Sequence, residues 1–155
     1  MNRNKFPRYR LPQVRVKLVH EGRSMFSDHP FENPAQIARA FSSLIRYSDR
    51  EVVAVVLLDT ALHPVAFNII SVGSVNESMV PAYQVLRPAI LSGASGIVML
   101  HNHPSGNLQP SDHDLECTRS MIEACRICGI QLLDHLICSG NDYVSLAQTT
   151  RIFDE

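Results

Sequence analysis

The chain has 155 residues, of which 45% are hydrophobic and 19% are charged, a balance typical of one soluble globular domain. Its formal net charge of −1 argues against a surface built mainly for nucleic acid. No apolar run approaches the roughly 20 residues that span a bilayer, and no hydrophobic segment follows the charged N-terminus as in a secretory signal. These properties predict a cytoplasmic protein without membrane contact.

Positive charge is concentrated at the N-terminus. Six basic residues and no acidic residue precede Glu21, namely Arg3, Lys5, Arg8, Arg10, Arg15 and Lys17. Such a terminus is typical of a solvated, flexible tail, which we predict over residues 1–12. The alternative is a basic arm that makes weak contacts with DNA phosphates. Residues 13–155 are predicted to form one domain, because no repeat or low-complexity segment interrupts them.

Predicted strands and helices alternate along that domain. The segment 51–59 is continuously apolar and rich in valine, as expected of a strand covered on both faces. Asn33 and Pro34 are typical helix-start residues, and Gly129 suits a helix end. The predicted strands are 14–20, 51–59, 65–73, 96–103, 130–138 and 143–146, and the predicted helices are 34–47, 81–91 and 112–128. The alternation predicts an α/β domain, with helices flanking a mixed central β-sheet.

The stretch HNHPSGNLQPSDHD, residues 101–114, joins the end of a buried strand to the start of a helix. If the strand continues through His101 and His103, both imidazoles point to the same side of the sheet. The proline and glycine that follow predict a sharp turn. Ser111 is then well placed as a helix N-cap, and Asp114 at the third helical position can project back toward the histidines.

Two neutral imidazoles and one carboxylate are a normal ligand set for a catalytic zinc ion, with the fourth position left for water. The alternative is that Ser111 and Asp114 form a capping box, which needs no metal, and that the two histidines are a coincidence. The occurrence of both halves across one short turn favours the metal. The two interpretations are compatible, because Ser111 can cap the helix while its hydroxyl faces a bound substrate.

Other histidines and the cysteines have simpler interpretations. His113 is predicted to face solvent, and His135 to be a buried, hydrogen-bonded histidine, although Asp134 or His135 could also orient a metal ligand. The four cysteines are predicted to be small buried thiols, since a zinc ribbon needs a second Cys-x-x-Cys pair; they are Cys117, Cys125, Cys128 and Cys138.

The pattern of two histidines, seven intervening residues and then Ser-x-x-Asp resembles the JAMM signature of JAB/MPN metallohydrolases. The version HNHPSG followed by PS-x-x-D is similar to the RadC family. Further similarity lies in VLLDT after Glu51, in GSVNESMV at 73–80 and in GIQLLDHLICSG at 129–140, so that the resemblance covers roughly residues 14–148. It implies the layered JAB/MPN architecture, which is similar to that of cytidine deaminases, and one zinc ion.

The resemblance also implies roles for individual residues. His101, His103 and Asp114 would hold the zinc ion, Glu51 would be the general base, and Ser111 would hydrogen-bond the developing oxyanion. The implied activity is that of a metallopeptidase or isopeptidase acting on a peptide or an isopeptide-linked protein. The alternative is a non-catalytic or DNA-associated RadC-like binding module. A zinc deaminase is excluded because the chain lacks the His-x-Glu and Pro-Cys-x-x-Cys motifs.

Two departures from the family pattern stand out. The family sequence His-Pro-Arg-Glu is replaced by Pro81-Ala82-Tyr83-Gln84, so the basic and acidic pair is missing here. The chain also resembles short family members, which lack an N-terminal helical DNA-binding module.

Overall fold

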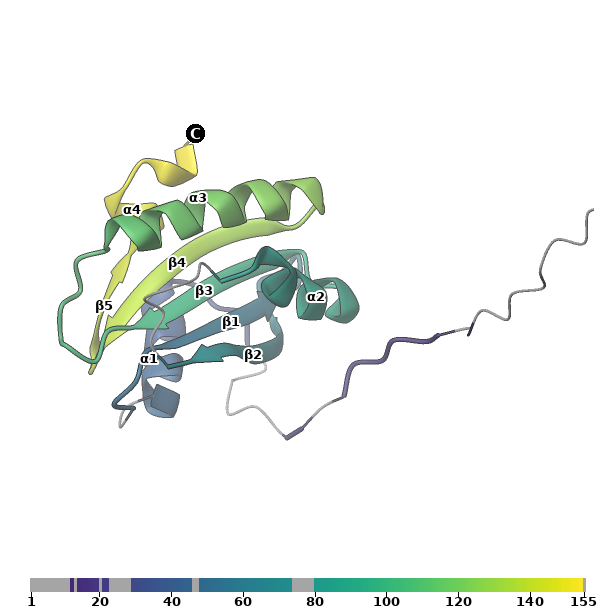
Figure 1. Cartoon of the computed structure of the whole chain (residues 1–155), viewed down its shortest axis with the longest axis horizontal. Helices are drawn as coiled ribbons and strands as arrows, with labels where there is room; N and C mark the ends of the chain where they lie inside the picture. The colour runs from purple at the N-terminus through teal and green to yellow at the C-terminus, as the bar shows by residue number, and fades with distance from the viewer. Residues whose placement is uncertain are drawn as a thin grey trace, which may run out of the picture.

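The computed structural model describes residues 12, 14–19, 21–22, 29–45, 48–73 and 80–154. Five strands form one sheet in the order β2-β1-β3-β4-β5 (Figure 1). The strands are β1 (Val52–Leu58), β2 (Pro64–Val72), β3 (Gly96–Asn102), β4 (Gln131–Ser139) and β5 (Asp142–Ser145). The helices are α1 (Pro34–Ile45), α2 (Ala82–Ser92), α3 (Asp112–Ile127), α4 (Leu146–Thr149) and the 3-10 turn η1 (Ile152–Asp154).

The sheet is mixed, which confirms the predicted α/β class. Strand β1 is antiparallel to β2 and β3, β3 is parallel to β4, and β4 is antiparallel to β5. The parallel pair requires a crossover, and α3 supplies it across one face of the sheet (Figure 1). The ends of β3 and β4 therefore lie side by side at the edge where α3 begins.

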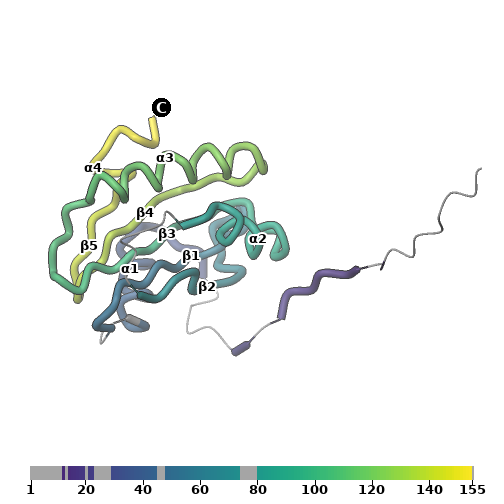
Figure 2. The backbone as a smooth tube through the Cα atoms, viewed as in Figure 1, coloured from purple at the N-terminus to yellow at the C-terminus, as the bar shows by residue number. Residues whose placement is uncertain are grey.

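Helices cover both faces of the central strands, so every residue of β1 and β3 is buried. Val53 and Val55 of β1 belong to the core that includes α2 and α3 residues. Ala54 and Val56 belong to the second core, which includes Phe41 of α1. The backbone trace shows α1 on the face opposite α3 (Figure 2). Burial on both faces explains the unbroken apolar run, because neither side of these strands meets water.

Local signals place most helix ends as predicted. The Asn33 side chain accepts a hydrogen bond from the Gln36 N–H at 3.1 Å, and Pro34 is the first helical residue of α1. Gly129 follows α3 with a φ of 69°, a left-handed conformation that glycine adopts without strain. The predicted end of α1 near Tyr47 lies outside the described residues.

The predicted strand over 14–20 is wrong for its described part, residues 14–19, which form no regular secondary structure. Val14, Val16 and Val19 are between 66% and 79% exposed. Alternating apolar residues favour a strand only where a neighbouring strand supplies hydrogen bonds, and none of the described strand pairs includes this segment. Apart from residue 12, the predicted basic tail lies outside the described residues.

Two smaller predictions also need correction. Residue 146 begins the short helix α4 instead of ending a strand. Cys117, Cys125 and Cys138 are buried free thiols as expected, but Cys128 is exposed because it caps the C-terminus of α3. Within the part of the chain that the structure describes, no helix is long and apolar enough to cross a membrane.

Candidate metal centre

Two histidines converge where β3 ends. His101 is the penultimate residue of β3 and is paired in register with Val53 of β1, while His103 follows the strand. Their ring centroids are 4.7 Å apart and the rings are nearly perpendicular. His101 is only 5% exposed. The strand end therefore brings both imidazoles to one point at the edge of the sheet.

The start of α3 brings a carboxylate to the same point. The hydroxyl of Ser111 accepts the Asp114 N–H at 3.2 Å, and Asp114 Oδ2 accepts the Ser111 N–H at 2.8 Å, which completes a capping box. The Ser111 hydroxyl also donates to Asp114 Oδ2 at 2.6 Å. Asp114 Oδ1 lies 3.0 Å from His101 Nδ1, and Oδ2 lies 3.6 Å from His103 Nε2. The cap thus holds the carboxylate against the two histidines.

We call His101, His103 and Asp114 the ligand triad. One potential ligand atom from each lies within 4.8 Å of the others, and no other group of three such residues in the described ranges meets this criterion. His103 Nδ1 is 2.6 Å from the Asn107 carbonyl, so it donates its proton there and leaves the Nε2 lone pair for the site. His101 Nε2 is buried and has no hydrogen-bond partner among the residues that the structure describes. This donor set fits a divalent metal ion, which would satisfy the orphaned nitrogen.

Electrostatics keep the carboxylate of the triad ionised. Burial alone would raise the pKa of Asp114, but the hydrogen bonds from His101 and Ser111 outweigh it. The pKa is consequently held well below the usual value for an aspartate. Asp114 is therefore a carboxylate anion at neutral pH, which is the form that binds a metal ion.

Glu51 lies beside the triad although it is distant in sequence. It immediately precedes β1, and its Oε2 is 3.8 Å from His101 Nε2. Glu51, Ser111 and the ligand triad all line one cleft of about 500 Å³. Sheet pairing between β1 and β3 explains this proximity, because it aligns the start of one strand with the end of the other. A second carboxylate, one third exposed, thus stands at the mouth of the candidate metal site.

A buried ring contact and two buried hydrogen bonds connect the triad to residues of β4 and α3. The His135 ring of β4 is stacked on His101, with ring centroids 6.3 Å apart. His135 Nδ1 lies 2.7 Å from the Thr118 hydroxyl, and that hydroxyl donates to the Asp114 carbonyl at 2.6 Å. Burial lowers the pKa of His135 to about 4, so the ring is neutral at pH 7. Sequence reasoning missed Thr118; its position one helical turn after Asp114 was the available signal.

The prediction that His113 faces solvent is wrong. The residue is half-buried, its Nε2 is fully buried, and it lines the same cleft as Glu51. Positions 113, 117 and 121 fall on one face of a helix, and Cys117 and Met121 are buried in the core. His113 therefore lies on the buried face of α3. The next residue, Asp114, contacts His101 and His103.

The part of the sequence that contains this site is similar to known proteins. The family profile described as RadC-like JAB domain matches residues 31–151, most of the chain. The chain belongs to the RadC-like JAB domain family. A UPF0758 protein of Desulfitobacterium hafniense is 39% identical to this RadC-like JAB domain over 132 residues, which cover 82% of this chain and 58% of the relative. UPF0758 proteins of a Cyanothece species and of Finegoldia magna are 34% and 37% identical, over 88% and 80% of this chain and 58% and 56% of theirs.

The RadC-like JAB domain thus spans somewhat more than half the length of these relatives. The family match begins at residue 31 and includes every residue of the site described above. The departure at 81–84 lies at the start of α2, and none of these four residues lines the cleft that contains the ligand triad. There Tyr83 is largely exposed, and the Arg87 guanidinium lies 5.3 Å from the centre of its ring. The replaced segment therefore forms part of the helix surface.

Proposed function

We propose that this RadC-like JAB domain is a zinc-dependent hydrolase that cleaves amide bonds in peptides or isopeptide-linked proteins. One observation carries the proposal: two imidazoles and an ionised carboxylate converge, with a second carboxylate 3.8 Å from one of the imidazoles. Structural zinc sites fill all four positions with protein ligands, whereas three ligands beside an open cleft are typical of hydrolytic sites. The cleft of about 500 Å³ leaves room for an extended peptide segment.

The ligand triad would hold the ion through one imidazole nitrogen from each histidine and one oxygen of Asp114. A zinc ion bound in this way supplies Lewis acidity, which activates water near neutral pH. Zinc is the ion we propose because imidazole and carboxylate donors in a three-ligand set suit it. His135 and Thr118 would keep the triad in place, since one contacts His101 and the other binds the backbone of Asp114.

Glu51 would act as the general base. Its carboxylate can accept a proton from the attacking water and return that proton to the leaving amine. A third of the side chain is exposed, so the carboxylate is accessible from the cleft. Ser111 would hydrogen-bond the oxyanion that develops on the substrate carbonyl, for which its hydroxyl would turn from Asp114 Oδ2 toward the cleft.

The proposal is tested by metal content and by cleavage. We expect the purified chain to hold one zinc ion and to cleave members of a panel of peptides and isopeptide-linked ubiquitin-like or synthetic substrates. Glu51→Gln should keep its zinc and lose about 10²- to 10⁴-fold in cleavage rate, the usual contribution of a general base. His101→Ala should lose both zinc and cleavage. A folded wild-type chain that binds no zinc, or cleavage that does not depend on Glu51, would contradict the proposal.

The second candidate is a non-catalytic module that associates with DNA. It rests on the six basic residues and the lack of acids before Glu21. We expect salt-dependent DNA binding in this case, because each neutralised phosphate releases a counterion. Loss of binding on removal of residues 1–12, which hold four of these six residues, would support this candidate, and no binding at low salt would exclude it.

A further inference from the structure

Asn102 lies between the two histidines of the triad, but its side chain binds the chain around Glu51. Its Oδ1 accepts the Val52 N–H at 2.5 Å, and its Nδ2 donates to the Arg50 carbonyl at 3.1 Å. The residue is 4% exposed. One buried carboxamide is therefore hydrogen-bonded to the backbone on both sides of Glu51.

These two hydrogen bonds take the place of strand pairing where the pairing of β1 with β3 ends. In the ladder between β1 and β3 the last pair is Val53 with His101. Beyond that pair the Asn102 side chain supplies the acceptor for the next N–H of β1. On the other side, the Gly73 N–H donates to the Glu51 carbonyl at 2.9 Å. The backbone of Glu51 is thus fixed from both neighbouring strands, although residues 49 and 50 just before it are exposed.

The chemistry of the side chain matches this role. The two bonds need an acceptor for the Val52 N–H and a donor for the Arg50 carbonyl at the same time, and a carboxamide offers both on separate atoms. Aspartate offers only acceptors when ionised, and a hydroxyl offers both functions from a single atom. The same residue is covalently joined to His101 and His103. A single side chain therefore connects the two histidines of the ligand triad to the backbone of the candidate base.

We infer that Asn102 is a positioning residue that sets the distance between the Glu51 carboxylate and the metal centre. The inference rests on the proposed function of Glu51 as general base. Without the carboxamide, the Val52 N–H would lose its buried acceptor and the Arg50 carbonyl its donor, so the backbone on both sides of Glu51 would be held less firmly. The carboxylate would then sample a wider range of positions, and fewer of them would be productive.

The kinetic test uses the zinc-loaded full chain with the substitution Asn102→Ala. We expect kcat to fall about 10- to 100-fold, as for other residues that orient catalytic groups, with KM and zinc content nearly unchanged. In a Glu51→Gln background the same substitution should have no further effect on kcat, because the group that it positions is already disabled. Additive losses in the two backgrounds would show a merely structural role and overturn the inference.

Two further variants guard against effects on folding. Asn102→Ser adds no buried charge and keeps a hydroxyl that can bond to one of the two backbone groups but is too short to reach both, so its loss of kcat should be smaller than that of Asn102→Ala. It carries the test if the alanine variant does not fold. Ser42→Ala is the matched control: Ser42 is also buried, and its hydroxyl donates to the Ala38 carbonyl within its own helix, α1. This control should leave kcat unchanged.

A readout without turnover separates this inference from the proposed function. In the cobalt-loaded chain with ¹³C-labelled glutamate, the Glu51 carboxylate carbon should relax rapidly because the paramagnetic ion is near. Asn102→Ala should reduce that relaxation and should speed amide exchange at Val52 at least about tenfold. If the wild type cleaves nothing but this change occurs, the proposed function fails and the positioning role stands. Unchanged relaxation in Asn102→Ala would overturn the inference, whether or not the wild type is active.

Discussion

Two buried aspartates of this domain are bound in nearly the same way and sit in different surroundings. Asp114 binds Ser111, the N-cap residue of α3, and Asp134 binds Ser145, the N-cap residue of α4. Each carboxylate accepts one serine hydroxyl at 2.6 Å and at least one backbone N–H. Both are 5% exposed or less. Their local hydrogen bonding alone would not tell which of them has a function.

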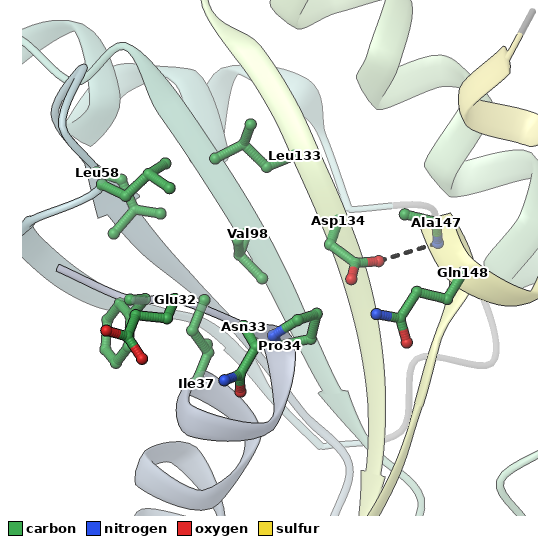
Figure 3. A pocket seen from close by; sticks show the side chains of 12 residues that line it. Glu32, Asn33, Pro34, Ile37, Leu58, Val98, Leu133, Asp134, Ala147 and Gln148 are labelled. Carbon is green, nitrogen blue, oxygen red and sulfur yellow. Dashed lines mark hydrogen bonds between the residues drawn. The ribbon is translucent and has the colours of Figure 1, made fainter.

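The neighbours of the two carboxylates differ. Asp114 lies against His101 and His103, and the hydrogen bond from His101 helps to hold its pKa below the usual value despite its burial. The donors to Asp134 within the described residues are neutral, namely the Ser145 hydroxyl and two backbone N–H groups, and burial raises its pKa. Its surroundings are a mainly apolar pocket of about 280 Å³ beside α1, and its carboxylate is bonded to the Ala147 N–H (Figure 3). The imidazole neighbours, and not the number of hydrogen bonds, distinguish the candidate functional carboxylate from the structural one.

The largest expected difference between the two aspartates concerns zinc. Asp114→Ala removes a proposed ligand and should weaken zinc binding by more than about a hundredfold. This loss exceeds the one expected for residues that only hydrogen-bond a ligand. Asp134→Ala should leave zinc affinity within about threefold of the wild type in whatever fraction folds, because no atom of Asp134 belongs to the triad. Competition with a chromophoric chelator measures both affinities. Equal losses in the two variants would contradict the division between a functional and a structural aspartate.

A smaller effect is expected on stability, and here Asp134 should matter. Asp134→Ala should lower the free energy of unfolding by about 3 kcal/mol, because three donors lose their acceptor: the Ser145 hydroxyl and the backbone N–H groups of His135 and Ala147. Chemical denaturation of the metal-free chain measures this loss. The matched control is Asp142→Ala at the exposed start of β5, which should change stability by less than about 0.5 kcal/mol. A loss no larger than that of the control would show that Asp134 does not stabilise the fold.

The contrast also shows what could be predicted from the sequence. The ligand triad was accessible because its three residues lie within 14 positions and local rules govern the turn and the cap between them. Glu51 is predicted as a candidate base only through the family resemblance, since its proximity to the triad depends on the pairing of β1 with β3. Asn102 and Thr118 were missed for the same reason: their roles arise from side-chain bonds that join separate elements or depend on the parallel register of β3 and β4.

The failed predictions have a similar cause. Alternation over residues 14–20 describes the side chains that a strand would need and says nothing about whether a partner strand is near. The prediction for His113 depends on its side chain pointing away from Ser111 and Asp114, whereas its partial burial follows from the helix face that it shares with Cys117 and Met121. Periodicity was reliable where both faces of an element are covered, as in β1 and β3. It was least reliable for single polar residues at the edge of the sheet.

The smallest expected effect concerns pH. The contributions of the two aspartates to the free energy of unfolding should change in opposite directions as the pH falls. The folded-state pKa of Asp114 lies below the ordinary value of 3.8, so its stabilising contribution is present above pH 3.8 and is lost as the pH falls through the folded pKa. The folded-state pKa of Asp134 lies above 3.8, so its contribution is full below that pH and is lost as the pH rises through the folded pKa. In metal-free protein, the cost of Asp114→Asn should therefore shrink on acidification, whereas the cost of Asp134→Asn should grow. Denaturant unfolding at several pH values between 3 and 7 measures both costs, and parallel trends would show that the imidazoles do not set the two carboxylates apart.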